Sequence, residues 1–201
     1  MQIEITDTGK NNQVEVASTA TCGPTLQVRI EGDHNHLMIG PGARLTGLIE
    51  IRNHHSSIRI GADCVINGQF RCRADHSHLS IGEATTIMMA TVTLHEAGRI
   101  SFGRDCMLSG DIQMDVSDIH SIIDVASGAR INPPQDIEIG THVWLGQGVR
   151  VLKGVRIGDN SIIGSRALVA GDIPAGSIAV GVPARVVRGG VTWDRRRLPW
   201  V

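Results

Sequence analysis

The sequence predicts an all-β fold, a parallel β-helix that winds as a single domain over residues 1–201. Two observations predict it: large aliphatic residues recur every six positions in the C-terminal half, and every 21 positions in the N-terminal half. A third agrees, since the chain has 24 glycines but only two phenylalanines, three tryptophans and no tyrosine. A period of six fits neither a helix nor a simple alternating strand, and hexapeptide repeats are a signature of β-helices.

Each six-residue unit is expected to hold one short strand and one turn. The aliphatic positions of the C-terminal units are Ile139, Leu145, Val151, Ile157, Ile163 and Val169. Because six is a multiple of two, alternate strand residues point inward, and the glycines that often follow the aliphatic residues serve the turns. Three units make an 18-residue coil, triangular in section, whose strands lie about 4.8 Å from those of the next coil.

The N-terminal coils are expected to carry three additional residues each. After a cap and first coil at about 1–30, the columns are Ile39, Ile60, Ile81 and Phe102 for the first units, Leu45, Ile66, Ile87 and Leu108 for the second, and Ile51, Cys72, Thr93 and Met114 for the third. The additional residues fall in the polar segments 33–36, 53–56, 75–78, 95–98 and 117–120. We therefore expect a ridge of small stacked loops along one corner.

Composition excludes several classes of partner. The formal net charge is −1, with 19 basic and 20 acidic residues, so no nucleic-acid partner is expected. No apolar run has the length of a membrane span, and the N-terminal segment carries no signal-peptide pattern. These features predict a cytoplasmic location without a membrane span.

The four cysteines are expected to be thiols, because no Cys-x-x-Cys pair occurs. In the predicted register Cys64 and Cys106 occupy the small inward position, in column with Ala43 and Thr85. They lie two coils apart, about 9.6 Å, which is too far for a disulfide.

Histidine is the obvious catalytic candidate, and most of the nine lie on the predicted ridge. The repeat places His34, His55 and His76 in one column, and His36, His78 and His120 in another. The first five of these, with His54, are expected to be turn residues that stack on their neighbours. Zinc carbonic anhydrases of the β-helix type use two histidines five residues apart, and no such pair occurs here, so no metal is expected.

His120 differs because the 21-residue register fails after it. Ile123-Asp124 stands where an Ile-Gly step is expected, and the segment 132–135 precedes the regular repeat. Such a break either forms a pocket or simply joins two registers.

The segment IGTHVWLGQGVRVLKGVRIGDNSIIGSRALVAGDIPAGSIAVGVPARVVR resembles the C-terminal signature of hexapeptide-repeat acyltransferases, and the resemblance is specific over Ser117 to Arg188. It implies a left-handed parallel β-helix that uses acetyl-CoA or a related thioester. Members similar to galactoside and maltose O-acetyltransferases have a catalytic histidine 24 residues before the tryptophan of the VWIG step. His120 precedes Trp144 by that distance.

The resemblance also implies the residues that bind the co-substrate. Besides Trp144, the implied positions are Gln147, Ser165, Ala170, Gly171, Arg185 and Arg188. The family often has Thr-Lys where this chain has Ala170-Gly171, and a small residue where it has Arg166, which is therefore an alternative phosphate ligand. Trp144 itself is expected to form a wall of the acceptor or thioester site, the alternative being a packing plug between coils.

The implied activity is O-acetylation of a sugar hydroxyl, in a capsular or cell-surface polysaccharide or its precursor, with His120 as general base. The implied assembly is a homotrimer with acetyl-CoA between adjacent subunits. Two alternatives stay open, an N-acetyltransferase for an amino sugar and a non-catalytic binding module. Residues 189–201 form a C-terminal tail, in which Arg195, Arg196 and Arg197 are expected to be a solvated cover over the open end of the coil.

Overall fold

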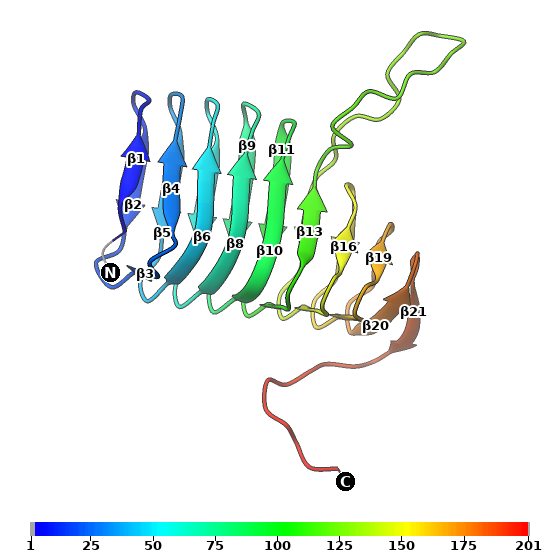
Figure 1. The fold of residues 1–201 in the computed structure, drawn as a ribbon. Helices are drawn as coiled ribbons and strands as arrows, with labels where there is room; N and C mark the ends of the chain where they lie inside the picture. The colour runs from blue at the N-terminus through cyan, green and yellow to red at the C-terminus, as the bar shows by residue number, and fades with distance from the viewer. Residues whose placement is uncertain (1–2, 201) are drawn as a thin grey trace.

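The computed structural model describes residues 3–200; residues 1, 2 and 201, which the predicted domain includes, lie outside the described part. Within that part the chain forms 21 β-strands in two sheets and no helix. Every strand pair is parallel except the last one. The coils stack side by side from the N-terminal to the C-terminal end (Figure 1). The predicted all-β parallel β-helix is therefore confirmed, while the left-handed sense stays what the resemblance implies.

The strands of the successive coils are divided between the two sheets. The seven-stranded sheet contains β2 (Gln13–Val16), β5 (His36–Ile39), β7 (Ser57–Ile60), β9 (Ser77–Ile81), β11 (Gly98–Phe102), β14 (Ile137–Ile139) and β17 (Arg156–Ile157). The fourteen-stranded sheet contains β1 (Ile5–Asp7), β3 (Thr21–Cys22), β4 (Gln27–Ile30), β6 (Arg44–Ile51), β8 (Val65–Cys72), β10 (Thr86–Leu94), β12 (Met107–Leu108), β13 (Ile112–Asp115), β15 (Trp144–Leu145), β16 (Arg150–Val151), β18 (Ile162–Ile163), β19 (Leu168–Val169), β20 (Ser177–Gly181) and β21 (Ala184–Gly189).

The strand pairing confirms both repeat lengths. Leu45 pairs with Ile66, Ile66 with Ile87, and Ile87 with Leu108, which is the longer period predicted for the N-terminal coils. Leu145 pairs with Ile163, which is the shorter period of three hexapeptide units. The shorter period begins after the ridge loops end.

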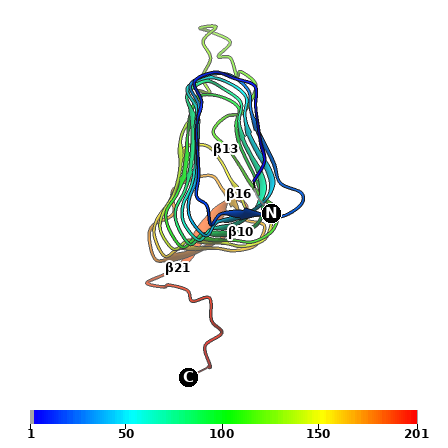
Figure 2. The same ribbon diagram turned by 90° about the vertical axis from the view of Figure 1, so that its left-hand side faces the viewer.

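The third column and the shape of the first coils differ from the prediction. Cys72 pairs with Leu94 and not with Thr93, because the register of β10 shifts between Ile87 and Ala90. The residues that cause the shift, Met88 and Met89, are exposed. β6, β8 and β10 also run without a break through the second and third units. The early coils are consequently elongated in section rather than triangular (Figure 2).

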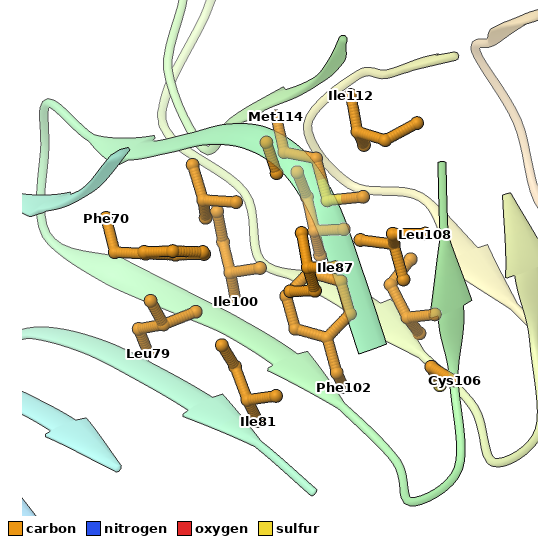
Figure 3. Packing of buried hydrophobic residues seen from close by; sticks show 14 of the residues in the cluster. Phe70, Leu79, Ile81, Ile87, Ile100, Phe102, Cys106, Leu108, Ile112 and Met114 are labelled. Atoms are coloured by element: carbon orange, nitrogen blue, oxygen red, sulfur yellow. The ribbon is translucent and has the colours of Figure 1, made fainter. Parts of the chain in front are cut away.

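The core is narrow and aliphatic, in keeping with the few aromatic residues of the sequence. Inward residues of successive coils interdigitate, and the two phenylalanines, Phe70 and Phe102, lie among Leu79, Ile81 and Ile100 (Figure 3). Cys64 and Cys106 are fully buried thiols, so the inward position predicted for them is confirmed. Burial raises the pKa of the Cys106 thiol to about 11.

The ridge of polar turns is also confirmed. The imidazole rings of His34, His55 and His76 stack in one column, with centroids 5.1 and 5.3 Å apart. All three residues have a positive φ of 57–59°, as tight turns require. Side chains link successive turns, since Asn35 accepts a hydrogen bond from the Ser56 amide at 2.9 Å. The histidines of this column are therefore structural turn residues.

His120 does not share the column of His36 and His78, which corrects the prediction. That column continues from His36 through Ser57 and His78 to Arg99. Phe102 pairs next with Ile139, where the longer period predicts Ile123. The inserted residues belong to a loop over 117–136 that projects beyond the coils (Figure 1). Ile139-Gly140, not Ile123-Asp124, therefore provides the next Ile-Gly step.

The C-terminal end differs from the prediction as well. β21 pairs antiparallel with β20 and so lines the last edge of the fourteen-stranded sheet. The tail then runs back along a corner of earlier coils rather than over the open end, because Arg195 pairs with Asp105 at 2.9 Å and donates to Thr86 at 2.9 Å. Arg196 pairs with Asp194 within the tail at 2.7 Å.

Candidate active site

The loop over 117–136 carries His120, which is exposed. The buried side-chain amide of Asn132 joins the two arms of this loop. Its Nδ2 donates to the carbonyl of His120 at 2.8 Å and to Asp118 at 2.9 Å. Its Oδ1 accepts from the amide of Ile122 at 2.7 Å and from Arg130 at 3.1 Å. The backbone on both sides of His120 is thereby fixed, while its ring faces solvent.

A second set of contacts ties the loop to the last turn of the ridge. Both terminal nitrogens of Arg130 donate to the carboxylate of Glu96 at 2.7 Å. The hydroxyl of Ser117 donates to the same carboxylate at 2.5 Å. The hydrogen bonds from Arg130 and then from Ser117 lower the pKa of Glu96 to about 2. Glu96 is therefore ionised near neutral pH and holds both arms of the loop.

A lysine of the following coil provides the third anchor. Nζ of Lys153 contacts Asp118 at 2.5 Å and donates to the carbonyl of Pro133 at 3.0 Å. The hydrogen bonds from Lys153 and Asn132 lower the pKa of Asp118. The base of the loop is consequently bonded to the coil before it and to the coil after it.

A groove of about 300 Å³ lies at the base of the loop, on the face formed by β10, β13 and β16. His95 and Asp115 form a hydrogen-bonded pair in it. Thr91, Thr93, Ser117 and Arg150 add further polar groups. The periodicity places 95–98 in an ordinary ridge segment and indicates neither this groove nor the Glu96–Arg130 pair. Aligning Ile139-Gly140 with Phe102-Gly103 would have revealed the inserted loop and its anchors.

Trp144 lies at a different corner of the coil, at the start of β15. Its ring is partly exposed and is tilted against that of Trp193, with centroids 6.1 Å apart. Trp193 in turn stacks on His142 at 4.0 Å and donates its indole N–H to the carbonyl of His142 at 2.7 Å. Trp144 thus stands beside the docked tail and is not enclosed between coils.

Asp105 organises the docking of that tail. It accepts from His142 at 2.7 Å and from Arg195 at 2.9 Å. Burial opposes ionisation of Asp105, but the hydrogen bonds from His142 and Arg195 outweigh it and leave its pKa lowered. This ionised carboxylate fixes the indole that Trp144 contacts.

Several of the predicted co-substrate residues share the next corner. The amide of Arg166 donates to the carbonyl of Gln147 at 2.7 Å, and both residues line a hollow of about 520 Å³ with Val182. Ser165 immediately precedes Arg166, and its backbone lies under Gly146. Any Cβ at Gly146 would meet the backbone nitrogen of Ser165 at 2.7 Å, so only glycine permits this close stacking.

The remaining predicted positions lie elsewhere on the same two coils. Ala170-Gly171 follows β19 and stacks one coil beyond Leu152, whose amide donates to Val169 at 2.9 Å. That corner is the one to which the loop is anchored. Arg185 and Arg188 are exposed on β21. Among the described residues neither they nor Arg166 has a carboxylate partner, so three guanidinium groups remain available for an anionic ligand.

One chain does not assemble all of these groups around His120. The loop base contacts Lys153, whereas Trp144 is nine residues earlier, with β16 and a corner between them. The loop also exposes five aliphatic side chains, Ile119, Ile122, Ile123, Val125 and Ile131. Exposed apolar side chains gathered on one projecting segment indicate a contact surface.

Parts of the chain are similar to known proteins that are named as acetyltransferases. Residues 136–171 match the family described as bacterial transferase hexapeptide (six repeats). The galactoside O-acetyltransferase of Escherichia coli (strain K12) is 52% identical over 52 residues, 26% of each chain. The polysialic acid O-acetyltransferase of Escherichia coli O1:K1 / APEC is 34% identical over 79 residues, 39% of this chain and 26% of that protein. The matched segments span about a quarter of these curated relatives.

Two solved structures resemble the chain over almost its whole length. The polySia-specific acetyltransferase NeuO has a TM-score of 0.83 and 28% identity, with 98% of this chain and 91% of that one covered. The polysialic acid O-acetyltransferase OatWY has a TM-score of 0.88 and 27% identity, with 98% and 93% covered. The predicted resemblance to hexapeptide-repeat acetyltransferases is therefore confirmed, and it extends beyond Ser117 into the N-terminal coils.

Two further observations concern ligands and membranes. Within residues 3–200 no three histidine, cysteine or acidic side chains converge as metal ligands would, and the expected absence of a metal remains a prediction. The part of the chain that the structure describes contains no helix able to cross a bilayer.

Proposed function

We propose that the protein is an O-acetyltransferase that moves the acetyl group of acetyl-CoA to a hydroxyl group of a sugar in a polysaccharide. The observation that carries the proposal is the likeness over 98% of the chain to two acetyltransferases whose names give polysialic acid as the acceptor. The 24-residue spacing of His120 and Trp144 supports it from the sequence. A capsular or cell-surface polysaccharide, or its precursor, is the acceptor we propose.

His120 is the proposed general base. A sugar hydroxyl becomes a competent nucleophile when its proton is removed as it attacks, and an imidazole can accept that proton. The hydroxyl oxygen attacks the thioester carbonyl, the carbon–sulfur bond of the resulting tetrahedral intermediate breaks, and the imidazolium returns the proton to the CoA thiolate. The exposed ring on a fixed backbone suits this role, because it can meet a substrate without reorganising the loop.

Acetyl-CoA is proposed to bind along the corners that carry Gln147, Ser165, Ala170 and Gly171, with Trp144 as a wall. The guanidinium groups of Arg185 and Arg188, which have no carboxylate partner among the described residues, suit its phosphates, and Arg166 offers another. The cleft is proposed to form between the subunits of a homotrimer. In that assembly the projecting loop of one subunit would bring His120 to the Trp144 corner of its neighbour, and its five aliphatic side chains would be covered.

A cytoplasmic location is proposed with this function. Cys64, Cys72 and Cys106 are buried thiols, as is usual in a reducing compartment, and acetyl-CoA is a cytoplasmic metabolite.

The test is transfer of radiolabelled acetate from acetyl-CoA to a panel of glycans that includes polysialic acid, galactosides and amino sugars. Label should appear in a glycan and be released by mild base, as esters are. Label that resists base would instead indicate an amide and an N-acetyltransferase. Binding of acetyl-CoA without transfer to any glycan, or no binding at all, would contradict the proposed enzyme.

A further inference from the structure

We propose that the outer face of the early coils carries a binding track for an anionic polysaccharide, made by Arg52, Arg71 and Arg73 and leading to the groove below the His120 loop. This inference rests on the proposed function, because it names the residues that would hold the acceptor. It adds that the acceptor is recognised through its negative charges.

The track is organised by a buried carboxylate, that of Glu50, whose side chain is only 3% exposed. Three guanidinium groups surround it, with nitrogen–oxygen distances of 3.2 Å to Arg52, 3.8 Å to Arg71 and 3.7 Å to Arg73. The one other carboxylate paired with them in the described chain is Glu31, 3.7 Å from Arg52. Positive charge therefore exceeds negative charge at this place, although the whole chain has a formal net charge of −1.

The hydrogen-bonding capacity of these arginines is largely unused. Each guanidinium has five donors in a fork that matches a carboxylate. Within residues 3–200 none of the three guanidinium groups donates a hydrogen bond to another side chain or to the backbone, and the buried Nε atoms of Arg71 and Arg73 have no hydrogen-bond partner. The side chains of Arg52, Arg71 and Arg73 are 43%, 23% and 36% exposed. Their outer nitrogens can thus receive an anion from solvent.

The strand register connects this cluster to the candidate active site. Glu50 pairs with Arg71, Arg71 with Thr93, and Thr93 with Asp115, so one outward column crosses four coils. Thr93 and Asp115 line the groove at the base of the loop that carries His120. Cys72 pairs with Leu94, so His95, which follows Leu94, is the equivalent on the next coil of Arg73, which follows Cys72. His95 lies in the same groove. A ligand on the arginines would therefore lead into the groove without crossing a corner.

The spacing of the coils indicates the kind of ligand. Guanidinium groups on successive coils are offset by about 4.8 Å along the axis. A linear glycan with an anionic group on each sugar can place several of them on such a row, and each guanidinium–carboxylate pair adds directional, charge-assisted hydrogen bonds. A neutral glycan would leave the arginines without an acceptor. A carboxylated and a sulfated glycan share the chemistry that the track requires.

Binding without acetyl-CoA tests the track separately from catalysis. The probes are polysialic acid oligomers, the same oligomers with reduced carboxyl groups, and dextran sulfate, measured by calorimetry on the full chain. Arg71→Gln/Arg73→Gln should weaken binding of the anionic probes about tenfold or more, since each substitution removes charge-assisted hydrogen bonds to the ligand. Arg59→Gln/Arg99→Gln removes equal charge from the seven-stranded sheet and should change the affinity less than about twofold.

The outcomes separate the track from the proposed enzyme. Tight binding of dextran sulfate alone, lost in the double variant, would support the track and assign a sulfated acceptor. Equal affinity of the wild type for reduced oligomers, or unchanged affinity of Arg71→Gln/Arg73→Gln, would overturn it even if acetyl transfer occurs. Loss of binding in that variant without any acetyl transfer would keep the track and remove the enzyme. Because the double variant leaves the buried carboxylate of Glu50 with Arg52 as its one guanidinium partner among the described residues, Glu50→Gln/Arg71→Gln/Arg73→Gln should repeat the result with no buried charge.

Discussion

Arg130 forms a bidentate ion pair with Glu96, which lies 34 residues earlier in the sequence. Each terminal nitrogen of Arg130 is 2.7 Å from a carboxylate oxygen. This pair joins the returning arm of the projecting loop to the last turn of the ridge. Ser117, at the start of the loop, donates to the same carboxylate at 2.5 Å. The position of His120 thus depends on Glu96, which lies in the preceding coil. In our proposal Glu96 does not contact a substrate.

Glu96→Gln is therefore expected to lower kcat about tenfold while the Kd for acetyl-CoA stays unchanged. The amide keeps the shape of the side chain but loses the charge-assisted bonds that hold both arms. Hydrogen exchange should become faster in residues 118–132. Glu83→Gln is the matched control, because Glu83 meets Arg104 at 3.9 Å on the exposed surface. A kcat for Glu96→Gln equal to that of the control would mean that the loop holds its position without this pair.

The same pair predicts an acid sensitivity. The pKa of Glu96 is lowered to about 2 in the folded protein, against about 4.3 for an unperturbed glutamate. A lowered folded-state pKa contributes stability above the unfolded pKa, and this contribution is lost as pH falls from about 4.3 towards 2. Protection of the loop amides should fall over that range, and Asp118, whose pKa is also lowered, adds to the effect. Glu96→Gln should show a smaller change over the same range; an identical profile would assign the sensitivity to other carboxylates.

How much of this was predictable differs between the coils and the loop. The columns of Leu45 and Leu145 follow from periodicity, because every inward position must carry a residue that fills a narrow core. The slip at Thr93 does not follow, since the two residues that bulge, Met88 and Met89, are as apolar as a regular strand would be. Local pattern alone cannot distinguish a strand with one inserted residue from a regular strand.

The loop was harder to predict for a related reason. Ile123 lies 21 residues after Phe102 by chance, so the sequence reads as an imperfect continuation of the repeat. In the structure an inserted loop interrupts the repeat there, and Phe102 pairs with Ile139. The family resemblance and the 24-residue spacing identified His120 and Trp144 as candidate site residues. They did not predict that the two residues lie at different corners of one chain. Long-range pairs such as Glu96 with Arg130 depend on the insertion and on side-chain geometry, and no local signal reveals them.

His120→Ala is expected to lower kcat by about 10²- to 10⁴-fold, the usual scale for a general base, with little change in melting temperature or acetyl-CoA affinity. His78→Ala is the control. Its side chain lies on the seven-stranded sheet, where Nδ1 shares a hydrogen bond with the hydroxyl of Ser57 at 3.0 Å. Burial and then the charge of Arg99 lower the pKa of His78, which favours the neutral form of the control residue. Full activity of His120→Ala together with loss in His78→Ala would move the site to the early coils.

Arg185→Ala/Arg188→Ala is expected to weaken acetyl-CoA binding, and more strongly at low salt than at high salt, because exposed charge contacts are screened. Both residues are exposed on β21 and have no carboxylate partner among the described residues, so folding should be retained. Calorimetry measures the affinity. If the affinity is unchanged, Arg166→Ala becomes the variant that should weaken binding, since Arg166 lines the neighbouring hollow.

The assembly gives the last prediction. Light scattering should find three times the 21.5 kDa mass of one chain. If the loop of one subunit serves the Trp144 corner of its neighbour, two inactive variants should complement each other. His120→Ala and Trp144→Ala, each poorly active alone, should regain part of the wild-type kcat/KM when unfolded and refolded together, because some interfaces then pair an intact His120 with an intact Trp144. Mixing two preparations of the same variant is the control and should restore nothing. Activity that stays at the level of the single variants, in trimers shown by mass spectrometry to be mixed, would place both groups in one subunit's own site.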